Sequence, residues 1–116
     1  MNTRLGRLLL SLTREGLDSL IISQPANITY LTGYLSRDSY YVVTPRGIRY
    51  ITDPRYTAEA KSHLKATAEV IEYRGSLFET LARSCRQLGC RRVGFEERYM
   101  PYAEYQKISL HLIFGV

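Results

Sequence analysis

Four leucines near the start of the chain are spaced so that they fall on one face of a helix. Their positions follow the i, i+3, i+4 and i+7 pattern of an amphipathic helix: Leu5, Leu8, Leu9 and Leu12. The pattern predicts a helix at residues 2–15, ended by Gly16, and the apolar run at residues 18–23 predicts a buried strand. A one-sided helix followed at once by a buried strand indicates an α/β domain in which the helix covers a sheet.

The rest of the chain alternates between the same two kinds of pattern. Residues 39–44 and 48–52 are rich in β-branched and aromatic types and are joined by a Pro-Arg-Gly turn, which predicts an antiparallel hairpin. Asp53 and Pro54 are typical of a helix start, and Ser76 opens a capping box with a glutamate three residues later. The remaining predicted elements are helices at 54–64, at 77–88 and from 101 onward, and strands at 68–73 and 92–96.

An uncharged stretch, PANITYLTGY at residues 25–34, lies between the first strand and the hairpin. Pro25 suits the first position of a helix, and Gly33 can adopt the left-handed conformation that ends one. We therefore expect one or two helical turns there, followed by a loop at residues 34–39.

Polar aromatic residues gather around this loop in the sequence: Tyr30, Tyr34, Tyr40 and Tyr41. Tyrosine combines a large contact area with a hydrogen-bonding tip and is favoured at interfaces. Arg37 in the loop could clamp a carboxylate with two parallel hydrogen bonds. The alternative is that the tyrosines pack in the core while Arg37 pairs with Asp38 or with solvent.

The composition argues against several classes of protein. The net charge is +5, but the basic residues are scattered, whereas nucleic-acid binders concentrate them on one face or arm, so we expect no nucleic-acid partner. No apolar run approaches the roughly 18–20 residues that span a bilayer, and residues 1–13 lack a signal-peptide cleavage site. We expect a cytoplasmic protein without membrane contact.

Cys85 and Cys90 are too few for a disulfide framework and are interpreted as buried or incidental thiols.

The sequence contains no complete catalytic set. It has no phosphate-binding loop, no nucleophile elbow and no zinc-peptidase helix motif. Glu96 and Glu97 are adjacent and would point to opposite faces of a strand, so they are interpreted as a solvated strand end. His63 and His111 each stand alone and are interpreted as surface or packing residues. Because residues 113–116 are apolar, we expect that the chain is cut inside a longer protein.

Five short motifs occur in an order and at a spacing that resemble one family. They are GLDSLIIS at 16–23, PANITYLTGY at 25–34, VVTPRG at 42–47, TDPRY at 52–56 and VGFE at 93–96. Together they resemble the N-terminal domain of the creatinase/prolidase/aminopeptidase P family, and the resemblance covers nearly all of residues 1–116. It implies an α/β fold: a small three-layer domain with a central mixed sheet of about five to six strands flanked by helices.

Some residues match the family's motifs and are interpreted as fold-forming. They are Asn27, Tyr30, Gly33, Asp53 and Tyr56. We expect Asn27 and Asp53 to satisfy local backbone groups and Gly33 to supply a turn.

The resemblance also implies a function for the parent protein, which would be a Xaa-Pro dipeptidase or aminopeptidase. The catalytic pita-bread domain of that family is absent from this chain, and the expected divalent metal ions, manganese, cobalt or zinc, would bind there. The resemblance further implies that, as in the dimeric members of the family, this domain helps to form a homodimer, and that the loop after the Tyr-Leu-Thr-Gly motif is the part that can line the partner subunit's active site. Carried onto this sequence, the candidate residues for binding a proline-containing peptide are Tyr34, Ser36, Arg37, Asp38 and Ser39.

Two alternatives stay open at this point. Creatinase-like N-terminal domains also resemble parts of histone-chaperone subunits without catalysis, and the basic charge is the feature that favours such a binding module. A creatinase-type amidinohydrolase shares the same architecture, and Arg37 as a carboxylate clamp would suit its substrate equally well.

Overall fold

The computed structural model describes residues 3–64 and 66–96. The elements follow in the order α1 (Thr3–Arg14), β1 (Ser19–Ile22), α2 (Pro25–Thr32), β2 (Tyr40–Thr44), β3 (Gly47–Thr52), a 3-10 turn η1 (Pro54–Tyr56), α3 (Thr57–Leu64), β4 (Glu69–Glu72), α4 (Leu77–Gln87) and β5 (Val93–Phe95). Every element predicted before residue 97 is therefore present. The predicted helix from residue 101, His111, Glu97 and residues 113–116 lie outside the described residues. No helix among those described has the length and apolar character needed to cross a bilayer.

A single mixed sheet of five strands, in the order β4-β3-β2-β1-β5, forms the middle layer. Its centre is the predicted hairpin of β2 and β3, to which β1 adds antiparallel, with Ile21 opposite Val42. The two edge strands, β4 and β5, run parallel to their neighbours β3 and β1. The mixed sheet confirms the fold class expected from the sequence.

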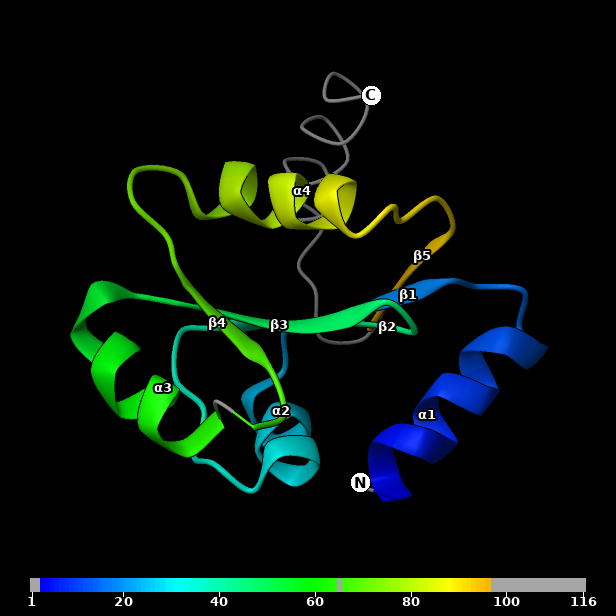
Figure 1. The fold of residues 1–116 in the computed structure, drawn as a ribbon, viewed down its shortest axis with the longest axis horizontal. Coiled ribbons are helices and arrows are strands. Elements are labelled where there is room, and N and C mark those ends of the chain that lie inside the picture. The colour runs from blue at the N-terminus through cyan, green and yellow to red at the C-terminus, as the bar shows by residue number, and fades with distance from the viewer. Residues whose placement is uncertain (1–2, 65, 97–116) are drawn as a thin grey trace.

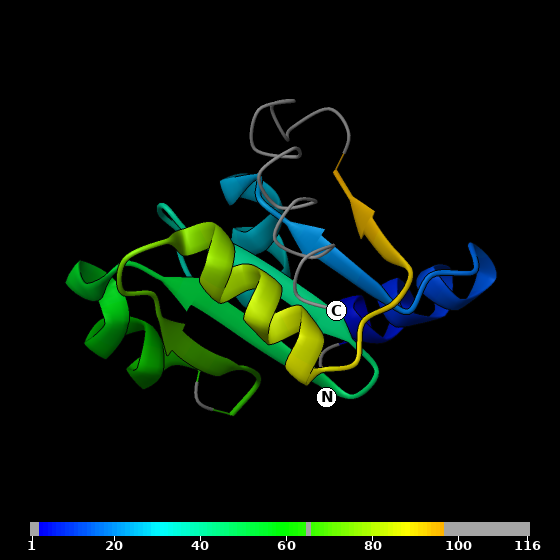
Figure 2. The ribbon, with the colours of Figure 1, turned by 90° about the horizontal axis from the view of Figure 1, so that it is seen from above.

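Helices cover both faces of the sheet, which gives the domain three layers. Figure 1 shows α4 on one face and α1, α2 and α3 on the other. Seen from above in Figure 2, α4 lies over the sheet, and β5 lies at the edge of the sheet beside β1.

Alternation along the strands divides the core between the two faces, because successive side chains of a strand point to opposite sides. Tyr41 and Val43 pack with the helices α1, α2 and α3, whereas Tyr40 and Val42 pack with α4. The run in β2 is buried throughout, as expected for a central strand covered on both sides.

The end of α1 shows how local sequence sets the path into the sheet. Gly16 has a φ of 74° and donates its N–H to Thr13 at 3.1 Å, while Leu17 N–H reaches back to the Leu12 carbonyl at 2.8 Å. This pair of bonds is a Schellman motif, whose left-handed position glycine occupies without steric cost. The apolar side chains of Leu12 and Leu17 occupy the positions that normally pack together in this motif.

A carboxylate fixes the start of β5 against the start of β1. Asp18 precedes β1, and its Oδ2 accepts the backbone N–H groups of Arg91 at 3.0 Å and Arg92 at 3.2 Å. Burial opposes the ionisation of Asp18, but hydrogen bonds from the Ser19 hydroxyl and from these two N–H groups outweigh it and lower the pKa. The ionised form of Asp18 is therefore the one that the fold stabilises.

A second carboxylate fixes the opposite end of the same strand pair. Glu96, directly after β5, accepts the N–H of Ser23 at 2.7 Å and of Gln24 at 2.9 Å through Oε1. Its Oε2 accepts from the side-chain amide of Asn27 in the first turn of α2. The interpretation of Glu96 as a solvated strand end was wrong, because these donors lie about 70 residues away in sequence and only the parallel pairing of β1 and β5 brings them together.

Candidate functional site

The helix α2 positions the predicted loop. Pro25 occupies its first turn, the Gln24 side chain caps it by accepting the Asn27 N–H at 2.8 Å, and Gly33 ends it with a φ of 74°. This confirms the predicted short helix and the role of Gly33. Asn27 does not satisfy local backbone groups with its side chain as expected, since its amide contacts Glu96 instead.

The first residue of the loop is buried. Tyr34 is 7% exposed, and its hydroxyl donates to Glu59 Oε1 on α3 at 2.8 Å. Burial, followed by the hydrogen bond to Glu59, raises the pKa of Tyr34 far above its ordinary value. His63 stacks on the Tyr34 ring with the ring centroids 5.0 Å apart, which confirms it as a packing residue at the surface. Tyr34 therefore anchors the loop to α3.

Two serines fix the remainder of the loop from inside. Ser36 is 5% exposed, and its hydroxyl pairs with the Tyr50 hydroxyl of β3 at 3.1 Å. Ser39, equally buried, donates to the Arg37 carbonyl at 2.6 Å and lies 3.3 Å from the Thr52 hydroxyl. Side chains that are buried and hydrogen-bonded in this way hold the loop's shape.

The tip of the loop, in contrast, is exposed. Arg37 and Asp38 point into solvent, and Asp38 has a φ of 46°, which turns the chain sharply between two buried serines. Asp38 pairs with Arg55 at 3.4 Å and not with Arg37. The guanidinium of Arg37 lies instead 6.0 Å from the ring centroid of Tyr56.

The guanidinium of Arg55 also lies near this ring, 5.1 Å from its centroid. Its Nε binds Asp53 Oδ1 at 2.9 Å, and that carboxylate also caps the η1 turn through the Arg55 N–H at 2.8 Å. The side-chain hydrogen bond from Arg55 is the main reason that the pKa of Asp53 is lowered. We call the surface formed by Arg37, Asp38, Asp53, Arg55 and Tyr56 the Arg37 patch.

The two arginines of the Arg37 patch differ in what they can still bind. Arg55 is compensated by two carboxylates, whereas the guanidinium of Arg37 lies against the ring of Tyr56. A guanidinium held over an aromatic ring keeps its hydrogen-bonding fork available for a carboxylate. The sequence analysis did not identify Arg55 and interpreted Tyr56 as fold-forming. The Asp53-Pro54 cap could have indicated both residues, because it fixes the direction in which the next two side chains project.

The tyrosines predicted to cluster around the loop are divided by the sheet. Tyr40 and Tyr41 are buried on opposite faces of the sheet, and burial raises the pKa of Tyr41 to about 12. Tyr30 is 58% exposed, and the Arg4 guanidinium lies 4.1 Å from its ring centroid. The core alternative thus holds for Tyr34, Tyr40 and Tyr41. Within the described residues, no three His, Cys, Asp or Glu side chains gather in a way that could hold a metal ion.

The sequence of the chain is similar to a known protein family and to a known protein. The sequence matches the family model of the creatinase/prolidase N-terminal domain over residues 4–114. It is 36% identical over 94 residues to the uncharacterized peptidase YqhT of Bacillus subtilis strain 168, a match covering 81% of this chain and 26% of that protein. The chain therefore spans about a quarter of this curated relative.

Solved structures share the fold. The N-terminal domain of the cytoplasmic peptidase PepQ from Mycobacterium tuberculosis H37Rv is 26% identical with a TM-score of 0.87, covering 97% of this chain and 87% of that one. A Xaa-Pro aminopeptidase from Streptococcus pyogenes is 28% identical with a TM-score of 0.85, covering 95% and 83%. A Xaa-Pro dipeptidase from Bacillus anthracis, at 19% identity and a TM-score of 0.89, matches 95% of this chain and 31% of its own; this likeness is one of fold alone.

Proposed function

The chain belongs to the creatinase/prolidase N-terminal domain family, and from that premise we propose that it is the non-catalytic N-terminal domain of a Xaa-Pro dipeptidase or aminopeptidase. Such an enzyme hydrolyses the peptide bond that precedes proline. The names of the similar proteins, a peptidase, an aminopeptidase and a dipeptidase, support this substrate class. The catalytic step would take place in a second domain, where divalent manganese, cobalt or zinc ions activate water.

The observation that carries the proposal for this domain is the exposed Arg37 guanidinium. It projects from a loop whose base is immobilised by the buried side chains of Tyr34, Ser36 and Ser39. A peptide substrate ends in a carboxylate, which a guanidinium binds through two parallel hydrogen bonds. We infer that Arg37 reaches the active site of a partner subunit and binds this carboxylate, while the three buried residues position the loop.

Exposed apolar side chains near the loop support a homodimer formed through this domain. Leu35 is 61% exposed and Tyr30 is 58% exposed, and both precede Arg37 by a few residues. Large exposed apolar side chains are a common feature of protein interfaces. In the proposed dimer, burial of Leu35 and Tyr30 at the interface would bring the loop to the partner subunit. We place this dimer in the cytoplasm.

The Arg37→Ala exchange in the complete peptidase tests this role. For a substrate with a free C-terminal carboxylate we expect KM to rise about tenfold, the effect of losing one partly exposed charge-assisted contact. Turnover of a C-terminally amidated substrate should be unaffected. Arg74→Ala is the matched control, because Arg74 is also exposed and lies in a different ion pair, with Glu72. Unchanged KM in Arg37→Ala for both substrates would exclude the clamp.

Three further measurements test the proposal and its alternatives. The 116-residue chain alone should hydrolyse no Xaa-Pro peptide in the presence of manganese, cobalt or zinc, and measurable turnover would contradict its non-catalytic role. Creatine hydrolysis by the complete protein would indicate an amidinohydrolase instead. Loss of the dimer in Leu35→Asp, measured by sedimentation, would support the interface; an unchanged dimer would remove Leu35 from it.

A further inference from the structure

The two cysteines occupy paired positions in the motif that ends α4. Gly89 has a φ of 69°, its N–H donates to the Arg86 carbonyl at 3.0 Å, and the Cys90 N–H donates to the Cys85 carbonyl at 2.9 Å. These bonds define a Schellman motif, in which the side chains on either side of the outer bond normally pack together. The end of α1 has the same bonds with leucines, Leu12 and Leu17, at the equivalent positions.

In α4, therefore, the backbone places two thiols where an apolar pair is usual. Both cysteines are free, and their side chains belong to the same core cluster, Cys85 as a fully buried member and Cys90 partly buried at its edge. Residues joined by a direct backbone hydrogen bond have Cα atoms about 5–6 Å apart, within the span that a disulfide bridges. The backbone spacing of the pair is therefore compatible with a disulfide.

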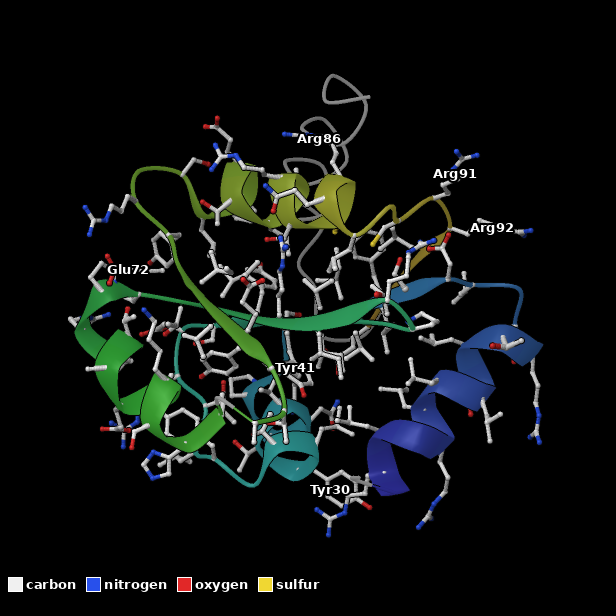
Figure 3. All side chains as sticks on the ribbon, viewed as in Figure 1. Tyr30, Tyr41, Glu72, Arg86, Arg91 and Arg92 are labelled. Atoms are coloured by element: carbon white, nitrogen blue, oxygen red, sulfur yellow. The ribbon has the colours of Figure 1, made fainter. Side chains whose placement is uncertain are left out.

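The surroundings of Cys90 favour its thiolate. Arg46 on the β2–β3 turn donates Nε to the Leu88 carbonyl at 2.6 Å and Nη2 to the Gly89 carbonyl at 2.7 Å, which places a guanidinium beside the helix end. Figure 3 shows Arg91 and Arg92, which follow Cys90, extending outward from this corner of the molecule. Positive charge near a partly exposed thiol is the setting in which cysteines become reactive.

The hydrogen bond that Cys85 donates is the main reason that the pKa of Cys90 is lowered, to about 7. The Ser19 hydroxyl and Arg46 lower it further, while burial and the Asp18 carboxylate act against them. The same hydrogen bond, together with burial, raises the pKa of Cys85, which stays a protonated thiol. Within the pair, Cys90 is therefore the thiol that ionises more easily, and Cys85 is the one that keeps its proton.

We propose that Cys85 and Cys90 are a peroxide-reactive thiol pair that closes reversibly into an intramolecular disulfide. The Cys90 thiolate attacks one oxygen of a hydroperoxide, the O–O bond breaks, and Cys90 becomes a sulfenic acid while hydroxide or an alkoxide leaves. The Cys85 sulfur then attacks the Cys90 sulfur, and the sulfenic oxygen leaves as water with the proton of Cys85. Hydrogen peroxide thereby takes two electrons from the thiols and yields two molecules of water, and a dithiol reverses the change.

This site is separate from the proposed peptide site. The thiol pair lies at the end of α4, on the opposite face of the sheet from α2 and α3, whereas the Arg37 patch is formed by the loop that follows α2 and the turn before α3. The thiol proposal therefore does not depend on the proposed peptidase role, and either can fail without the other.

The test treats the reduced full chain with a few equivalents of hydrogen peroxide, followed by trypsin and mass spectrometry without reduction. Cleavage after Arg83, Arg86 and Arg91 leaves the cysteines on separate peptides, 84–86 and 87–91. A disulfide joins them into one species that is lighter than their sum by two hydrogen atoms and disappears on treatment with dithiothreitol. We expect this species to become the major form of both peptides. Disulfide-linked dimers, or a Cys90 sulfinic acid with no linked peptides, would overturn the proposal.

Two variants test the separate roles of the thiols. In Cys85→Ser the sulfenic acid of Cys90 should persist and be trapped by dimedone, whereas in Cys90→Ser the Cys85 thiol should stay unmodified. Circular dichroism establishes that each variant is folded, and Cys85→Ala replaces Cys85→Ser if the buried hydroxyl prevents folding. In the folded wild-type chain, iodoacetamide should alkylate Cys90 at least about tenfold faster than Cys85. Equal alkylation of both thiols in the folded chain would contradict the proposal.

Discussion

Replacing Glu96 removes the carboxylate that joins the end of β5 to the start of α2. In the wild-type chain this carboxylate accepts two backbone N–H groups, from Ser23 and Gln24, and the side-chain amide of Asn27. Glu96→Ala removes all three bonds, whereas Glu96→Gln keeps one acceptor oxygen but loses the charge and sets an amide nitrogen against the Asn27 amide. The two variants therefore separate the hydrogen bonds from the charge.

The magnitude follows from the number of bonds and their exposure. Bonds to an ionised carboxylate stabilise a fold by about 1.5–3 kcal/mol each, but Ser23 and Gln24 are only partly buried and Asn27 is exposed, so about 1 kcal/mol each is appropriate. A carboxylate beside the first turn of a helix adds about 0.3–1 kcal/mol through the helix dipole. We expect Glu96→Ala to lower the free energy of unfolding by about 3–4 kcal/mol and Glu96→Gln by about 1 kcal/mol.

Urea unfolding followed by far-ultraviolet circular dichroism measures these differences, provided that the slope m stays constant. Glu79→Ala is the matched control, because Glu79 is exposed and its carboxylate pairs within α4 with Arg83, a contact worth about 0.3–0.5 kcal/mol. A double-mutant cycle of Glu96→Gln with Asn27→Ala isolates the side-chain contact, for which we expect a coupling of about 0.5–1.5 kcal/mol.

Glu96 is not such a link between β5 and α2 if Glu96→Ala destabilises the chain no more than Glu79→Ala does. Hydrogen exchange gives a local check, since the amides of Ser23 and Gln24 should lose protection in Glu96→Ala while those in the β2–β3 hairpin keep most of theirs. Loss of protection spread evenly over the sheet would mean that Glu96 stabilises the fold without acting as the local link described above.

Three further predictions concern other single positions. Asp18→Asn should lower the free energy of unfolding by about 1–2 kcal/mol at pH 7. Because the pKa of Asp18 is lowered in the fold, this loss is fully present above about pH 4 and should vanish as the pH falls through the pKa of the folded state; a pH-independent loss in urea titrations would contradict it. Gly33→Ala should destabilise the chain by about 1 kcal/mol through its positive φ alone, since a Cβ there meets no atom within 4 Å. Gly6→Ala inside α1 is equally unobstructed and should stabilise the chain by about 0.5–1 kcal/mol, and melting temperatures that shift in the same direction in both variants would refute this. The ultraviolet absorbance of the thiolate should titrate near pH 7 in the wild-type chain and lose this step in Cys90→Ser, and a single step at the ordinary value of about 8.5 would count against the assigned pKa.

Those features of the fold that depend on neighbours in sequence could be predicted from the sequence. The leucine spacing of α1, the glycine after it, the Pro-Arg-Gly hairpin turn and the caps at Asp53 and Ser76 all act within a few residues. In such cases the backbone donors that need a partner and the side chains that supply it lie in the same segment. The family resemblance added the mixed sheet and the three layers, which the structure confirms.

The candidate site could be located from the sequence but not resolved into its parts. All five predicted residues lie in the loop after α2, yet Tyr34, Ser36 and Ser39 face inward and only Arg37 and Asp38 face solvent. The direction in which each side chain points depends on the residues against which the loop packs. Here these are Glu59 of α3, 25 residues from Tyr34, and Tyr50 of β3, 14 residues from Ser36. Whether the five residues contact a substrate stays a prediction.

The order of the elements and most of their ends thus follow from local sequence patterns. The partners of the charged groups depend instead on the tertiary structure, which brings Glu96 to the start of α2 and Arg55 to Asp38. The physical reason is that local patterns fix backbone conformation over a few residues, whereas a charge in a folded chain is satisfied by whichever donor or opposite charge the packing of distant strands and loops brings within reach.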